Sequence, residues 1–88
     1  MAERRATVLN EAGIHARPSA EIVKLAARFA SHITIARDDL EVNAKSIMGV
    51  MMLAAERGTI LTIRAEGLDA EEAVAALERL LSGTFGER

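Results

Sequence analysis

The sequence of 88 residues has no cysteine, tryptophan or tyrosine, one proline and two phenylalanines. The lack of cysteine excludes disulfides, thiol catalysis and cysteine-ligated metals. With few aromatics and no block of basic residues, the chain lacks the stacking groups and the concentrated positive charge that nucleic acids require. It also has no apolar run of the ~20 residues that a membrane span needs, and no signal peptide is recognisable. We therefore expect a cytoplasmic protein without nucleic-acid or membrane partners.

Half of the residues are apolar, and 13 acidic and 11 basic residues give a net charge of -2. A chain of this length forms one domain, so we expect a single domain over residues 1–88, with a core of aliphatic side chains. A domain this small has little room for a deep internal site, so its chemistry should lie on the surface. No glycine-rich nucleotide-binding loop is present. The two histidines, His15 and His32, are too few for a metal site, so we expect no metal and no cofactor.

The first half of the chain alternates between strand and helix patterns. Residues 2–9 are typical of a strand, and Asn10 to Gly13 end it. An apolar stripe at helical spacing begins at Pro18 and continues to Ala30. His32 would then add a favourable charge at the carboxyl end of that helix. Residues 33–37 and 40–43 alternate in polarity and predict a hairpin.

The second half repeats the order helix, strand, helix. Residues 46–55 predict a short helix with Ser46 as N-cap and with Val50, Leu53 and Ala54 turned inward. Residues 60–66 predict a strand. Asp69 and Glu72 have the spacing of a capping box for a last helix that stops at Gly83.

The predicted order is therefore β-α-β-β-α-β-α. It favours an α+β, two-layer open-faced sandwich, in which a four-stranded antiparallel sheet carries three helices on one face. The other face should be solvated, because polar residues alternate along the strands. These residues are Arg5, Thr34, Glu41, Thr62 and Arg64.

His15 and Arg17 flank the predicted start of the first helix. A helix start presents unpaired main-chain amides and the positive end of the helix dipole, which together favour an anion. The Arg17 guanidinium can bind phosphate oxygens, and a neutral imidazole is a nucleophile near neutral pH. His15 could therefore carry a phosphoryl group, although a lone histidine at such a position most often has no chemical role. Because no nucleotide site is present, another protein would have to supply the phosphoryl group.

The segment around the second predicted helix is apolar on nearly all sides. If Val50 and Leu53 point inward, Ile47, Met48 and Met51 share the outer face. Methionine-rich surfaces adapt to several partners, but the same residues could simply fill a core without aromatics. Ser46 is first an N-cap; phosphorylated, it would place a charge that suits the helix start and disturbs an apolar partner.

Two motifs resemble those of the HPr family, the histidine-containing phosphocarriers of the bacterial phosphoenolpyruvate-dependent sugar phosphotransferase system. They are Gly13-Ile14-His15-Ala16-Arg17-Pro18-Ser19-Ala20 and Lys45-Ser46-Ile47-Met48-Gly49-Val50-Met51. The resemblance covers the whole chain. Two departures are Ala12, where many members have a polar residue, and residues 54–57, which replace a glycine-containing stretch.

This resemblance implies a role for each matching position. His15 would be phosphorylated on Nδ1 by enzyme I, with Ala16 and Arg17 binding the phosphoryl group, and would pass it to EIIA proteins. The docking surface would be formed by Ile47, Met48, Gly49 and Met51. Ser46 would be the regulatory site of an HPr kinase/phosphorylase. The chain would then be a carrier in sugar uptake, and not an enzyme.

Other functions stay open at this point. The same fold could be a regulatory binding module that transfers nothing and acts through contacts modulated at Ser46. It could also be a carrier of a nitrogen-type regulatory branch. A third possibility is a small ligand-binding domain of the ferredoxin-like kind, which would require a pocket. Nothing in the sequence forces association, so we expect a monomer.

Overall fold

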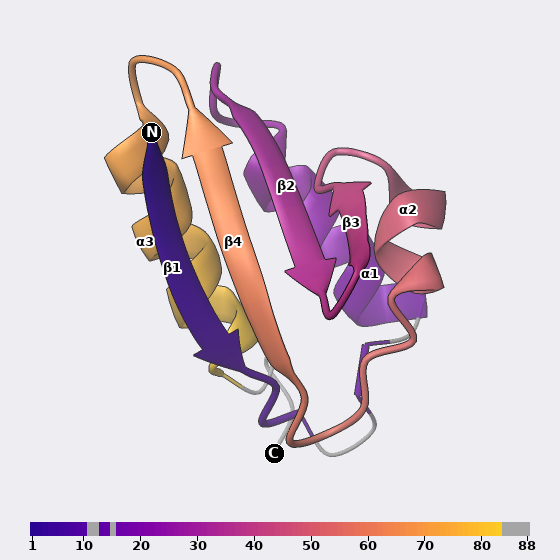
Figure 1. The fold of residues 1–88 in the computed structure, drawn as a ribbon. Coiled ribbons are helices and arrows are strands. Elements are labelled where there is room, and N and C mark those ends of the chain that lie inside the picture. Colours follow the sequence, from indigo (N-terminus) through magenta and orange to yellow (C-terminus); the bar gives the residue numbers. More distant parts are fainter. Residues whose placement is uncertain (11–12, 15, 84–88) are drawn as a thin grey trace.

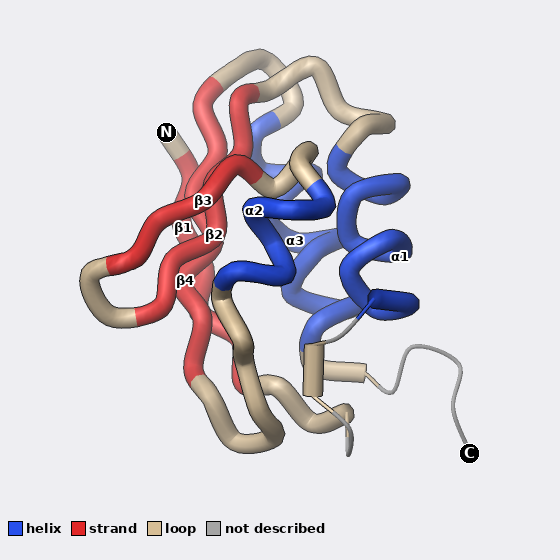
Figure 2. The backbone as a smooth tube through the Cα atoms, turned by 90° about the vertical axis from the view of Figure 1, so that its right-hand side faces the viewer, coloured by secondary structure: helices blue, strands red, loops and turns tan. Residues whose placement is uncertain are grey.

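The structure is a computed structural model that describes residues 1–10, 13–14 and 16–83. Its elements, in chain order, are β1 (Ala2–Thr7), α1 (Ala16–Ala26), β2 (His32–Arg37), β3 (Leu40–Asn43), α2 (Ile47–Met52), β4 (Ile60–Glu66) and α3 (Ala70–Leu81). The four strands form one antiparallel sheet in the order β1-β4-β2-β3 (Figure 1). The three helices lie on one face of this sheet (Figure 2). The expected fold class and element order are confirmed.

Alternation along the strands divides the sheet into a core face and an open face. In the central strand β4, Leu61, Ile63 and Ala65 are buried, while Arg64 between them is exposed. Ile63 pairs with Ile35 of β2, which is also buried, so the two central strands bury their apolar residues against the helices. The helices complete this core with the buried side chains of Ile22, Val50, Leu53, Val74, Leu77 and Leu81.

The edge strand β1 has a charged residue on its core face. Ala2 and Ala6 are buried, but Arg4 between them is exposed and reaches α3. Its Nη1 donates to the Glu78 carboxylate at 2.9 Å. This ion pair joins β1 to α3, and a charged side chain on the inner face of an edge strand opposes pairing with further strands.

Two expectations about α1 are wrong. The helix ends at Ala26, four residues before the end that the apolar pattern predicts, and a turn leads from there to β2. His32 is consequently the first residue of β2, where it is exposed, and does not lie at the end of a helix. The turn is fixed instead by Asp69, whose carboxylate accepts hydrogen bonds from the amides of Ala30 at 2.8 Å and Ser31 at 3.0 Å.

The same contacts correct the predicted capping box of α3. Asp69 occupies the N-cap position, but its side chain makes no capping hydrogen bond to the helix. Both carboxylate oxygens are used by the α1–β2 turn. Asp69 therefore connects two distant segments of the chain, and does not stabilise α3 in the local way that its spacing predicts.

Candidate functional site

His15, the predicted phosphoryl acceptor, lies outside the described residues, as do residues 11 and 12. The structure does describe its neighbours: Ile14 is buried, and Ala16 is the first residue of α1. Ala16 and Arg17 are both exposed in the first turn of this helix. The first main-chain amides of a helix have no acceptor within it. The chain at position 15 therefore adjoins an exposed, electropositive helix start.

Arg17 is available for an external ligand. In the part of the chain that the structure describes, its guanidinium has no hydrogen-bond or ion-pair partner. A planar guanidinium can make two parallel hydrogen bonds to a phosphate. Pro18, which follows, is buried. Because proline has no main-chain amide hydrogen, it leaves no donor without an acceptor in the first turn of α1.

The segment before α1 is fastened to the turn after α2. The amide of Ile14 donates to the carbonyl oxygen of Ala55 at 2.7 Å. On its other side, Gly13 donates through its amide to the carbonyl of Asn10 at 2.9 Å. The side-chain amide of Asn10 donates in turn to the carbonyl of Gly13 at 2.7 Å. Gly13 and Ile14 are thus held from both sides.

The helix α2 presents an apolar outer surface. Ile47, Met48 and Met51 are 46%, 76% and 44% exposed, which confirms that they share the outer face. We call these three residues, with Gly49, the α2 patch. Val50 and Leu53 are fully buried, as expected, whereas Ala54 is exposed. The expectation that Ala54 points inward is wrong because its backbone adopts a left-handed conformation, with φ of 47°, and leaves the helix.

Ser46 begins α2 as its N-cap, as predicted. Its hydroxyl oxygen accepts a hydrogen bond from the amide of Gly49 at 3.1 Å. The side chain is partly exposed and adjoins Ile47 of the α2 patch. A phosphoryl group on Ser46 would therefore put negative charge at the border of an apolar surface.

The α2 patch and the start of α1 belong to one region of the molecule. The helices α1 and α2 pack against each other, and the Ile14–Ala55 hydrogen bond joins the segment before α1 to the turn after α2 (Figures 1 and 2). Among the predicted site residues that the structure describes, Arg17 and the α2 patch thus lie on neighbouring elements.

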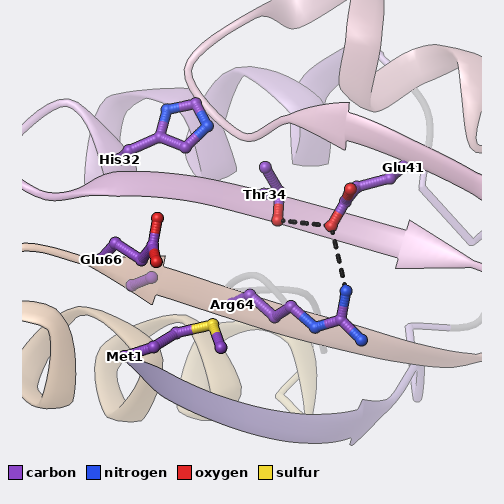
Figure 3. A pocket seen from close by; sticks show the side chains of 7 residues that line it. Met1, His32, Thr34, Glu41, Arg64 and Glu66 are labelled. Carbon is purple, nitrogen blue, oxygen red and sulfur yellow. Dashed lines mark hydrogen bonds and ion pairs between the residues drawn. The ribbon is translucent and has the colours of Figure 1, made fainter.

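The open sheet face has a different character. A shallow hollow of about 230 Å³ lies over β2, β3 and β4, lined by Met1, His32, Thr34, Glu41, Arg64, Ala65 and Glu66 (Figure 3). Arg64 lies 3.4 Å from both Glu3 and Glu41, and Thr34 donates to Glu41 at 2.9 Å. These side chains satisfy one another, as on an ordinary solvated sheet face. The hollow therefore gives no support to a ligand-binding domain.

Two kinds of site are absent from the described residues. No cluster of three or more histidine, cysteine, aspartate or glutamate side chains is arranged to hold a metal ion. Among the helices of the same residues, none has the length and apolar character that crossing a bilayer requires.

The sequence reasoning missed Asn10 and Ala55, the two residues that hold Gly13 and Ile14. The motif Asn10 to Gly13 indicated only that a strand ends there. Asparagine and glycine are favoured at the first and fourth positions of a β-turn, so a local signal for a turn that begins at Asn10 existed. Ala55 gave none, because only the fold brings its carbonyl to Ile14.

Comparisons with known proteins agree along the whole chain. A family model described as the PTS HPr component phosphorylation site matches residues 2–83. The phosphocarrier protein HPr of Treponema pallidum is 51% identical over 87 residues, which cover 99% of each chain. The crystal structure of HPr-C-His from Thermoanaerobacter tengcongensis has a TM-score of 0.94 and 44% identity, with 100% of this chain and 99% of that chain covered. A structure titled as an HPr dimer from the same organism has a TM-score of 0.78 and 45% identity, covering 99% and 100%.

Proposed function

Because this chain belongs to the HPr family of phosphocarriers of the phosphotransferase system, we propose that His15 receives a phosphoryl group from enzyme I and passes it to an EIIA domain. The observation that carries this assignment to His15 is the family model, which spans residues 2–83 and includes the intact segment from Gly13 to Ala20. The exposed start of α1, with Ala16 and Arg17, supports it physically.

The transfer is a displacement at phosphorus. A lone pair on the His15 imidazole nitrogen Nδ1 attacks the phosphorus of the donor phosphohistidine, and a new P–N bond forms while the old one breaks. The donor imidazole leaves with the electron pair of the broken bond, and nothing is oxidised or reduced. Attack requires a neutral imidazole, which the positive end of the α1 dipole favours.

After transfer, the phosphoryl oxygens carry negative charge beside the helix start. The amides of Ala16 and Arg17 have no acceptor within α1, so they can donate to these oxygens. The exposed Arg17 guanidinium adds a positive charge. These groups would hold the phosphoryl group in place until an acceptor protein docks.

The α2 patch is the proposed docking surface for enzyme I and EIIA. Its apolar side chains are exposed on a helix that packs against α1, so a partner docked on α2 would lie beside α1. Ser46 is the proposed regulatory site of an HPr kinase/phosphorylase, since its hydroxyl lies at the border of this patch.

We place this activity in one cytoplasmic, monomeric carrier domain over residues 1–88. The chain needs no cofactor for the transfer, because donor and acceptor proteins supply the phosphoryl group and its destination. Without them it would turn over no substrate, so it acts as a relay and not as an enzyme.

Intact mass spectrometry after incubation with phosphoenolpyruvate and enzyme I tests the proposal. We expect one added phosphoryl group on the natural chain and none on His15→Ala. The matched control is His32→Ala, which removes the only other histidine, exposed on β2, and should be labelled fully. Label retained by His15→Ala would refute the assignment. Addition of EIIA should then remove the label; a label that stays would favour the regulatory binding module.

A further inference from the structure

Asn10 is a buried polar residue that contacts Gly13, two residues before the proposed phosphoryl acceptor His15. It is 0% exposed, and it contacts Gly13 twice, through its side-chain amide at 2.7 Å and its main-chain carbonyl at 2.9 Å. These two hydrogen bonds fix both the amide and the carbonyl of Gly13. The two hydrogen bonds therefore constrain the orientation of Gly13 relative to Asn10.

Ala55 holds the same segment from the opposite side. Its carbonyl accepts from the amide of Ile14 at 2.7 Å, and it lies so close to Gly13 that a Cβ there would be 2.6 Å from the Ala55 oxygen. Gly13 has a φ of 75°, which a glycine adopts without strain. Glycine is therefore needed at this position for both its conformation and its small size.

Packing alone does not explain an asparagine at position 10. Its Oδ1 has no hydrogen-bond partner in the described part of the chain, although the atom is buried. A buried polar atom without a partner destabilises a fold, and an apolar side chain of similar size would avoid this penalty. What asparagine adds is the donor to the Gly13 carbonyl.

We propose that Asn10 is a positioning residue for phosphoryl transfer. It holds Gly13 and Ile14 against Ala55, and so constrains the main chain that leads to His15. This inference rests on the proposed function of His15. It predicts an effect on the transfer step and not on docking, because Asn10 and Gly13 are buried and the α2 patch does not include them.

The test is rapid-quench measurement of phosphoryl transfer from phosphorylated enzyme I to Asn10→Ala, Asn10→Leu and Gly13→Ala. Leucine has the same branched shape as asparagine and removes the donor without leaving a cavity, but it is bulkier, so urea denaturation is used to verify that Asn10→Leu is folded. We expect the rate at saturating concentration to fall roughly 10- to 100-fold in each variant, as misplacement of a reacting group by about 1 Å can produce. The concentration of this chain that gives half of the maximal transfer rate should change by less than about twofold, because docking to enzyme I is intact. Ser31→Ala is the control, because it also removes a buried side chain that donates a hydrogen bond, here to Asp69, but lies beyond the far end of α1.

Each outcome decides the proposal. An unchanged rate in a folded Asn10→Leu, or an equal loss in Ser31→Ala, overturns the positioning role while the carrier function stands. A natural chain that takes no label overturns the carrier function and this role together. The double variant Asn10→Leu/Gly13→Ala should have a transfer rate only slightly below that of either single variant, because both changes release the same segment. Rate losses that multiply fully would show independent effects and would also contradict the proposal.

Discussion

Asp69 and Ser31, 38 residues apart in the chain, are joined by two hydrogen bonds to one carboxylate oxygen. The Ser31 amide donates to Oδ1 at 3.0 Å, and the Ser31 hydroxyl donates to the same oxygen. The Ala30 amide donates to Oδ2 at 2.8 Å. The Ser31 hydroxyl, followed by the Ala30 amide, lowers the pKa of the Asp69 carboxyl below its ordinary value of 3.8. One carboxylate therefore holds the α1–β2 turn against the start of α3.

Asp69→Asn should lower stability in a pH-dependent way. Because the folded-state pKa is lowered, the ionised carboxylate stabilises the fold fully above its ordinary pKa and progressively less as the pH falls below 3.8 toward the folded-state pKa. At neutral pH the natural chain should therefore unfold at a higher urea midpoint than Asp69→Asn. The difference between the two midpoints should become smaller in acid. A gap independent of pH would contradict this linkage.

Gly67→Ala should be strongly destabilising. Gly67 has a φ of 147°, and a Cβ there would lie 2.5 Å from the Ser31 hydroxyl oxygen and 2.7 Å from its Cα. We expect a loss of about 2–3 kcal/mol in the free energy of unfolding. Gly58→Ala is the matched control: its φ of 94° is also left-handed, but nothing lies within 4 Å, so only about 1–2 kcal/mol of backbone strain is expected. Equal losses would show that the contact with Ser31 does not matter.

Ala54→Gly should stabilise the chain. Ala54 has a φ of 47°, so its Cβ is strained in a way that glycine avoids. Relief of this strain exceeds the added flexibility of the unfolded glycine, and we expect a gain of roughly 0.5–1 kcal/mol in the free energy of unfolding. Ala75→Gly, inside α3, should instead lose about 1 kcal/mol. The melting temperature should therefore rise in Ala54→Gly and fall in Ala75→Gly. A lower melting temperature in both variants would contradict the prediction.

Substitutions at Ser46 should separate its structural role from its proposed regulatory role. Ser46→Ala removes the acceptor for the Gly49 amide and should cost about 1 kcal/mol of unfolding free energy. Ser46→Asp keeps a good N-cap and adds charge, so stability should be retained while affinity for enzyme I falls. Urea denaturation and calorimetric titration measure the two effects. Equal enzyme I affinity in Ser46→Asp and the natural chain would argue against regulation through this residue.

Truncation of the α2 patch should weaken docking. Met48 is its most exposed side chain, at 76%, and Met48→Ala should raise the dissociation constant for enzyme I by roughly tenfold, as loss of an apolar contact residue of moderate importance does. Leu68→Ala is the control, because Leu68 is 105% exposed but lies in the turn between β4 and α3. The control should bind normally. A similar loss in both variants would indicate a general effect of surface apolarity.

Local patterns were sufficient to predict most of the elements. The alternation of residues 60–66 gave the bounds of β4 as the structure has them, and Ser46 was identified as an N-cap from residue type and position alone. Helical geometry gave Ile47, Met48 and Met51 a common outer face, but it left open whether they are exposed or fill the core, and Gly49 was included only through the resemblance to the HPr family. These features depend on residues within a few positions of one another.

The errors at Asp69, at the end of α1 and at His32 arose where a distant segment decides the local structure. Asp69 has the spacing of a capping box with Glu72, but its carboxylate accepts hydrogen bonds from the α1–β2 turn and not from the start of α3. The early end of α1 and the position of His32 follow from that turn. The same reason explains why Ala55 was missed. His15, on which the function depends, was recognised from its motif, and its role stays a prediction.

The one-sided arrangement of the helices also makes the protein convenient to study. The open sheet face lies away from α1 and α2 (Figure 2), and Arg5 is exposed on it, with no part in the α2 patch or in the contacts of Gly13 and Ile14. Because the chain has no cysteine, Arg5→Cys would provide a unique thiol for a fluorescent dye. Such a reporter could follow partner binding and phosphoryl exchange in real time without obstructing either.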